Sequence, residues 1–123
     1  MNDEGNNALS AVRISLAVEP QNVAAHPTRL LQAVSDPIRW RVLRELVAGQ
    51  SLTVQQLAAK SGSTQNQMSK HLRVLREVGA LELVSPPDGD KRKAQHAVPK
   101  HFLRPDESGK AVIDFGACVL RFP

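Results

Sequence analysis

The sequence predicts an α+β domain in which a group of helices is followed by a β-hairpin. Apolar residues recur at helical spacing through residues 28–78, and the alternation typical of strands begins beyond Gly79. The length of 123 residues suits a single hydrophobic core, and 41% hydrophobic with 23% charged residues is ordinary for a globular protein. No apolar stretch reaches the roughly 20 residues needed to span a bilayer, so we expect no membrane segment.

The first part of the chain divides into a tail and a short strand. Residues 1–10 are small and polar, which predicts a disordered tail. Residues 11–27 are expected to form a strand and a loop, with a helix as the alternative to the strand. The strand prediction rests on alternating apolar residues, namely Val12, Ile14, Leu16 and Val18.

Two helices are predicted next. Thr28 can cap a short helix that runs to Val34, and Asp36 can cap a second helix with Pro37 at its first position. The apolar stripe of the second helix ends near Gly49. Trp40 lies off the centre of that stripe, which places it at a helix edge or in a dimer contact.

A helix-turn-helix unit follows. Thr53 can cap a helix, Gly62 can supply the positive φ of a tight turn, and a second helix over 64–78, capped by Ser63 or Thr64, stops at Gly79. The second helix buries one apolar face, formed by Met68, Leu72, Leu75 and Val78. The segment 51–53 before the first helix is too short for an independent strand.

Beyond the second helix the pattern predicts a hairpin and one further strand. Residues 81–84 and 93–98 read as strands around a turn at 86–90, and residues 111–122 read as a single strand with a bulge or bend at Gly116. Two helices in tandem with a following hairpin form a winged helix-turn-helix. We therefore expect that domain over 28–100, with an added C-terminal strand region over 101–123 that could serve dimerisation.

Basic charge is concentrated in the middle of the chain. The formal net charge is +4, yet the stretch from Arg39 to Arg104 carries twelve Lys and Arg against five acids. This distribution suits a polyanion-binding surface, although a solvated basic face explains it equally well. Candidate phosphate contacts in this stretch are Arg39, Arg41 and Arg44. A solvated helix surface is the alternative for each of them.

The predicted helix over 64–78 carries the side chains expected to read DNA. Asn and Gln hold a donor and an acceptor together and can discriminate base edges in the major groove, while Lys and Arg reach guanine or phosphate. The alternative is an ordinary polar helix face. The candidate DNA-binding residues are Thr64, Gln65, Asn66, Gln67, Ser69, Lys70 and Arg73 on this helix, and Lys91, Arg92 and Lys93 on the wing over 85–93.

Two segments resemble the ArsR family of transcription regulators. Residues 63–81, reading STQNQMSKHLRVLREVGAL, resemble the recognition-helix signature, and residues 31–43, reading LQAVSDPIRWRVL, resemble the motif that precedes it. The resemblance implies a winged helix-turn-helix dimer that represses transcription. It assigns the base-reading and groove-lining positions to Gln65, Asn66, Gln67, Ser69 and Lys70, and places His71 nearer the core or a phosphate.

The sequence departs from that family in its metal sites and its C-terminus. Residues 51–57 read SLTVQQL, without the Cys-x-Cys element that many relatives use for metals, and the C-terminal region reads as strand rather than helix. His96, His101 and Cys118 match no zinc spacing, so no metal site is expected. We therefore expect a dimer whose interface differs from that of the family. Residues 12–18 could instead pair with residues 112–122, within or between subunits.

Cys118 is the only cysteine, which excludes an intrachain disulfide. The apolar residues around it predict a buried side chain that packs in the core, with a redox sensor that forms an intersubunit disulfide as the alternative. A single thiol and an acidic start at Asp3 and Glu4 fit a cytoplasmic location.

Together these features predict a sequence-specific regulator of transcription that binds double-stranded DNA, a homodimeric repressor without a cofactor. The alternative is a winged-helix module that binds a partner protein. An enzyme is not expected, because the sequence has no phosphate-binding glycine loop, no nucleophile with an evident base and no paired carboxylates in a plausible cleft. The sequence does not identify an effector.

Overall fold

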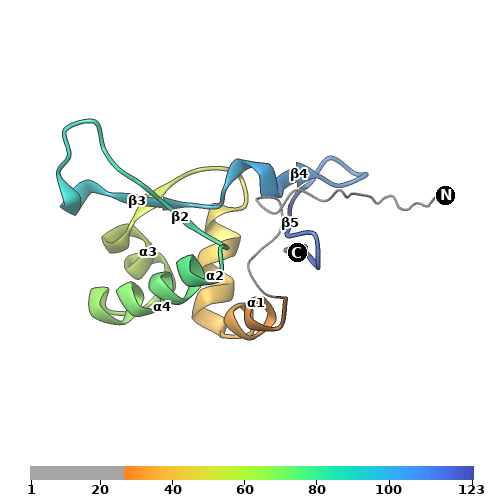
Figure 1. Ribbon diagram of the computed structural model, residues 1–123, viewed down its shortest axis with the longest axis horizontal. Helices are drawn as coiled ribbons and strands as arrows, with labels where there is room; N and C mark the ends of the chain where they lie inside the picture. The colour runs from red at the N-terminus through yellow and green to blue at the C-terminus, as the bar shows by residue number, and fades with distance from the viewer. Residues whose placement is uncertain (1–26) are drawn as a thin grey trace.

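The computed structural model describes residues 27–123, apart from the side chain of Lys91. The tail expected over 1–10 and the strand expected over 12–18 lie outside these residues. In the described part, four helices and two three-stranded antiparallel sheets alternate only once: the first strand, β1, lies between α2 and α3, and all other strands follow the last helix. Figure 1 shows the helices gathered below β2 and β3, with β4 and β5 at the end of the molecule away from the tip of the wing. This is an α+β fold, a winged helix-turn-helix with an added strand region.

The four helices of the described residues confirm the predicted ones within a few residues. Their bounds are α1, Pro27–Val34; α2, Pro37–Leu46; α3, Val54–Ser61; and α4, Gln65–Glu77. The Asp36 carboxylate caps α2, accepting the backbone N–H of Ile38 at 2.8 Å and of Arg39 at 3.1 Å. The cap predicted at Thr28 is wrong, because α1 already begins at Pro27, whose missing N–H is harmless at a first helical position.

The apolar stripes of the helices meet in one core. Met68, Leu72 and Leu75 of α4 are fully buried, as the spacing predicted. They belong to the same cluster as Leu43 of α2 and Leu57 of α3. Each helix of the helix-turn-helix is thus fixed by its apolar face, which leaves the other face of α4 free for binding.

The wing is a three-stranded sheet rather than a two-stranded hairpin. Its strands are β1, Leu52–Thr53; β2, Glu82–Val84; and β3, Gln95–Ala97, in the order β1-β3-β2. The segment before α3, too short to stand alone, pairs with β3, because an existing strand supplies its hydrogen-bonding partners. The returning strand starts at Gln95 instead of residue 93, because Lys91–Lys93 form a 3-10 turn, η2.

The C-terminal region forms a second sheet, and the single strand predicted over 111–122 is wrong. A short 3-10 turn, η3, spans Lys100–Phe102, and the strands are β4, Leu103–Pro105; β5, Ala111–Asp114; and β6, Val119–Leu120. The chain reverses between β5 and β6, with the Phe115 N–H donating to the Cys118 carbonyl at 2.9 Å. Gly116 adopts φ +87°, so it serves a reversal rather than a bulge within one strand.

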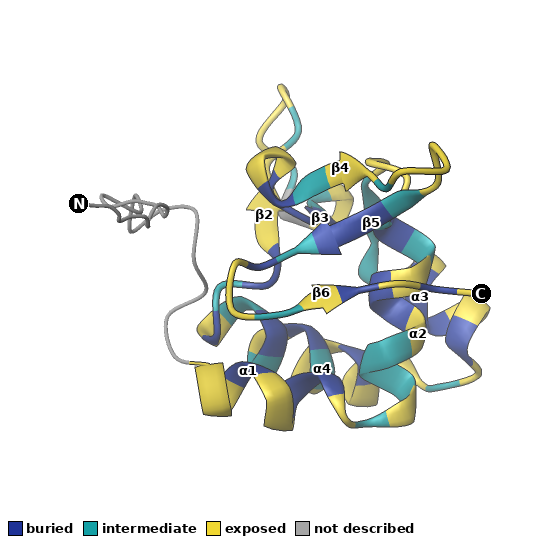
Figure 2. Cartoon of the chain, turned by 90° about the vertical axis from the view of Figure 1, so that its right-hand side faces the viewer, coloured by how far each residue is buried: buried dark blue, intermediate teal, exposed yellow. Residues whose placement is uncertain are grey.

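This second sheet joins the helical core. Phe102 and Phe115 lie with ring centroids 4.9 Å apart in the core, and Figure 2 shows β5 largely buried. Cys118 is half-buried against the same core, and burial, followed by the charge of Asp114, raises the pKa of its thiol. Trp40 is half-buried against Phe122, so the described residues give it a partner within the chain.

Candidate nucleic-acid interface

The start of α4 is fixed by a reciprocal capping box. The Thr64 hydroxyl accepts the backbone N–H of Gln67 at 3.1 Å, and the Gln67 side-chain oxygen accepts the backbone N–H of Thr64 at 3.2 Å. The same arrangement joins Thr53 and Gln56 at the start of α3. Because both boxes satisfy backbone N–H groups that a helix leaves unpaired, each helix of the motif begins at a defined residue.

The turn between α3 and α4 depends on Gly62. Its φ of +69° lies in the left-handed region, and its N–H donates to the Ala58 carbonyl at the end of α3. A side chain there would meet no atom within 4 Å, so the requirement is conformational and not one of space. This turn sets the direction in which α4 leaves α3.

The polar face of α4 points outward, as the sequence predicted. Asn66, Ser69, Lys70 and Arg73 are exposed on the side away from the buried apolar residues. Arg73 also pairs with Glu77, with Nε and Oε2 3.4 Å apart at the surface. Thr64 and Gln67 are exposed as well, but their side chains already take part in the capping box.

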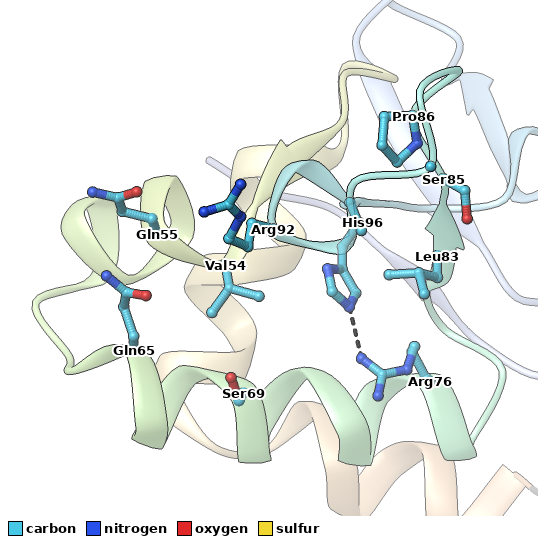
Figure 3. Close-up of a pocket in the computed structure, with 12 residues that line it drawn as sticks. Val54, Gln55, Gln65, Ser69, Arg76, Leu83, Ser85, Pro86, Arg92 and His96 are labelled. Carbon is cyan, nitrogen blue, oxygen red and sulfur yellow. Dashed lines mark hydrogen bonds between the residues drawn. The ribbon is translucent and has the colours of Figure 1, made fainter.

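A groove of about 800 Å³ separates α4 from the wing. Figure 3 shows Gln65, Ser69 and Arg76 along one side of α4, facing the wing residues across this groove. The lining residues are Val54, Gln55, Gln65, Ser69, Arg76, Leu83, Ser85, Pro86, Gly89, Arg92, Ala94 and His96. Of the predicted DNA contacts, the groove therefore brings together Gln65, Ser69 and Arg92.

The basic residues of the wing are paired with acids of the same loop. The Arg92 guanidinium contacts both carboxylate oxygens of Asp90 at 3.2 Å, and the Lys93 amine lies 2.8 Å from Asp88. The hydrogen bond from Lys93 lowers the pKa of Asp88, and that from Arg92 lowers the pKa of Asp90. Arg92 nevertheless keeps 90% of its side chain exposed, so it can still meet a solvent-borne partner. Lys91 belongs to η2 in the same loop.

Arg76 and His96 form a contact that the sequence did not predict. Arg76 Nη1 lies 2.7 Å from His96 Nε2, and His96 is only 3% exposed in the middle strand of the wing sheet. Burial, reinforced by the charge of Arg76, lowers the pKa of His96 to about 4. His96 is therefore neutral near pH 7, and Nε2 must act as the acceptor because a guanidinium can only donate.

A signal for Arg76 was present in the sequence. Gln65, Ser69 and Arg76 stand at positions i, i+4 and i+11, which share one side of a helix. No comparable signal pointed from His96 to Arg76, since a strand partner cannot be read from helical spacing. Gln55, at the start of α3, was missed because its place in the groove depends on how α3 packs beside α4 and the wing.

His71 lies at the junction of the first helices with α4. It is half-buried, with Nδ1 3.2 Å from Arg39 Nη1 and 4.0 Å from Asp36 Oδ1. Arg39 also donates to the Ala33 carbonyl at 2.6 Å. The side chain of Arg39 thus links α1 to α4, whereas Arg41 and Arg44 are exposed.

Within residues 27–123, no group of three or more His, Cys, Asp and Glu side chains is arranged to hold a metal ion. His96 is engaged with Arg76, and His101 lies beside Phe102 with ring centroids 4.3 Å apart. None of the helices in this described part is long and apolar enough to cross a bilayer.

Comparison with known families agrees with the geometry. Residues 34–84 match a family model described as a helix-turn-helix domain, a range that takes in α2, β1, α3, α4 and β2. No curated protein matches the chain. Domains of this kind place their second helix in the major groove of DNA. The chain thus carries a helix-turn-helix domain, completed by a wing, of the type found in DNA-binding regulators.

Proposed function

We propose that this protein is an ArsR-like regulator of transcription that binds double-stranded DNA with sequence specificity. The observation that carries the proposal is the arrangement of α4, whose apolar face is fully buried while its amide and basic side chains face solvent beside a basic wing. A helix of 13 residues, about 20 Å long, fits the major groove of B-DNA.

The exposed residues divide by chemistry into base-reading and backbone contacts. Gln65 and Asn66 stand in the first turn of α4, where amide side chains can form paired hydrogen bonds with adenine. Lys70 and Arg73 lie further along the same exposed face and suit guanine or phosphate. The wing over 85–93 supplies Arg92 and Lys93 for the backbone.

The proposed regulator acts as a homodimer that represses by occupying a promoter. Two copies of α4 about 34 Å apart would enter successive major grooves of an imperfect palindrome. Leu31 of α1 and Val119 of β6 leave 52% and 37% of their surface exposed, which are apolar positions that a second copy could cover. Repression then follows from exclusion of the transcription machinery.

Binding to selected DNA tests the main proposal. Genomic fragments retained by the protein would be sequenced, and the affinity for the best fragment measured by fluorescence anisotropy at several salt concentrations. Lys70→Ala and Arg73→Ala should weaken binding, whereas Lys110→Ala, an equal loss of charge in the exposed loop between β4 and β5, should not. Equal affinity of all three variants and the wild type would exclude α4 as the reading element.

The same experiment separates DNA binding from a protein-interaction module. A regulator should be retained on heparin and on mixed genomic DNA, because contacts to phosphate contribute to binding of any sequence. Failure to bind either material would favour the protein-interaction module.

Oligomeric state and repression need their own measurements. Light scattering after size exclusion should give twice the chain mass of 13.4 kDa, and a footprint should cover two half-sites. Transcription in vitro from the bound promoter should fall as protein is added. A monomer with a single half-site would contradict the dimer but leave DNA binding intact.

A further inference from the structure

Arg76 is distinguished from the neighbouring arginines by the partner that holds it. Arg73 and Arg92 each pair with a carboxylate, of Glu77 and Asp90 respectively. Arg76 instead contacts the neutral ring of His96, and none of the twelve residues that line the groove is acidic. Within the described residues, therefore, the positive charge of Arg76 is held in place without being neutralised.

The position of Arg76 suits a backbone contact. It stands in the last turn of α4, half-buried, and lines the groove between that helix and the wing together with Ser69. Figure 3 shows its guanidinium directed upward from α4 toward the wing strand that carries His96. A DNA strand that runs from the helix to the wing has to cross this groove.

We propose that Arg76 contacts a DNA phosphate in the groove between α4 and the wing, and that His96 is the positioning residue that holds its guanidinium there. This inference rests on the proposed DNA-binding function. Within residues 27–123 the guanidinium has only the histidine nitrogen as a hydrogen-bond partner, so its remaining N–H groups can meet phosphate oxygens. The same contact ties the middle strand of the wing to the recognition helix.

Packing alone does not account for a histidine at position 96. With Nε2 accepting from Arg76, the ring proton resides on Nδ1, and Nδ1 is buried without a hydrogen-bond partner among the described residues. A buried donor without a partner opposes folding, and an apolar ring would fill the same space without it. What the histidine adds is an acceptor aimed at Arg76.

The experiment compares Arg76→Gln, His96→Phe and their double variant with the wild type, on the DNA selected above. Arg76→Gln should weaken binding about tenfold and reduce the slope of log affinity against log salt by about one unit. His96→Phe should lose much of the same affinity and slope although Arg76 is present, and the double variant should lose no more than Arg76→Gln alone. His96→Gln, whose side-chain oxygen can accept from Arg76, should recover part of the loss.

Thermal unfolding separates positioning from folding. A purely structural histidine would lower the melting temperature on substitution and leave the salt slope of the folded protein unchanged. If His96→Phe does not fold, ¹⁵N NMR of the wild type takes its place. The ring should show its proton on Nδ1, and the Arg76 side-chain signals should shift when DNA is added.

The phosphate contact, the positioning role of His96 and the proposed DNA binding are each contradicted by a different result. A wild-type salt slope in Arg76→Gln, or unshifted Arg76 signals on DNA addition, would overturn the phosphate contact. A wild-type slope and affinity in His96→Phe would overturn the positioning role. Absence of DNA binding by the wild type itself would overturn the proposed function instead.

Discussion

The rings of Trp40 and Phe122 lie with their centroids 4.7 Å apart, at an interplanar angle of 50°. This contact attaches the segment after β6 to α2, the helix that precedes the helix-turn-helix. Phe122 is buried in the core cluster, with Trp40 packed against it. The C-terminal sheet and the helix-turn-helix should therefore unfold together.

Phe122→Ala should destabilise the whole domain by about 3 kcal/mol, because it removes a buried aromatic ring and leaves a cavity beside Trp40. Urea unfolding followed by Trp40 fluorescence measures the change. Lys110→Ala, in the exposed loop between β4 and β5 of the same sheet, is the control and should change stability by about 0.5 kcal/mol or less. Two separate transitions would contradict a shared core.

Thr64→Ala and Thr53→Ala should each lower the free energy of unfolding by about 1 kcal/mol, because each removes one capping box. The two boxes share no residue, so the double variant should show about the sum of both losses. Thr64→Ser retains the hydroxyl and should stay near the wild type. Denaturant unfolding of the four variants measures these changes. A Thr64→Ala protein with the same free energy of unfolding as the wild type would contradict the stabilising role of the cap.

His96 should make stability depend on pH in mildly acidic solution. Its pKa falls from 6.5 to about 4 on folding, so the unfolded chain takes up the proton first as the pH decreases. The free energy of unfolding should therefore decrease between pH 6.5 and 4 and receive no further change from His96 below that range.

His96→Phe should remove this dependence. Between pH 7 and 4.5 the wild type should lose about 2 kcal/mol more free energy of unfolding than the variant. The other titrating groups are common to both proteins, so their contributions cancel in this difference. Unfolding in urea at each pH provides the measurement. If the free energies of unfolding of the two proteins change in parallel with pH, His96 takes up its proton equally in the folded and the unfolded chain.

Asp88→Asn should strengthen DNA binding, because it releases Lys93 from its partner in the wing. The salt dependence should become steeper by up to about one unit if Lys93 then meets a phosphate. Glu107→Gln removes an equal charge in the turn before β5 and should leave affinity unchanged. Weaker binding by Asp88→Asn would mean that the ion pair shapes the wing.

The helices and their caps could be predicted because the signals are local. Asp36 and Thr53 were identified from the residues that immediately follow them, and Gly62 from the turn it occupies. For α4 the sequence left Ser63 and Thr64 open, and the structure places the cap at Thr64. The outward face of α4 followed from the spacing of Met68 and Leu72, which the structure buries. The assignment of individual side chains to DNA bases remains a prediction.

The strands were less predictable because their partners are distant in the sequence. Leu52 pairs with His96, and a two-residue strand has no periodicity of its own. The reversal at Gly116 was mistaken for a bulge or bend within one strand, since a glycine with positive φ serves any of these purposes. Only pairing between Ile113 and Leu120 distinguishes a hairpin from one bent strand.

The sequence by itself determined a helix-turn-helix with one apolar and one polar face on its second helix, because helical periodicity and caps depend on neighbours within four residues. Tertiary structure alone decided that the wing has a third strand, that Phe122 meets Trp40 and that His96 holds Arg76. These contacts join residues at least 20 positions apart, and they form only when packing of the core brings the separate elements together.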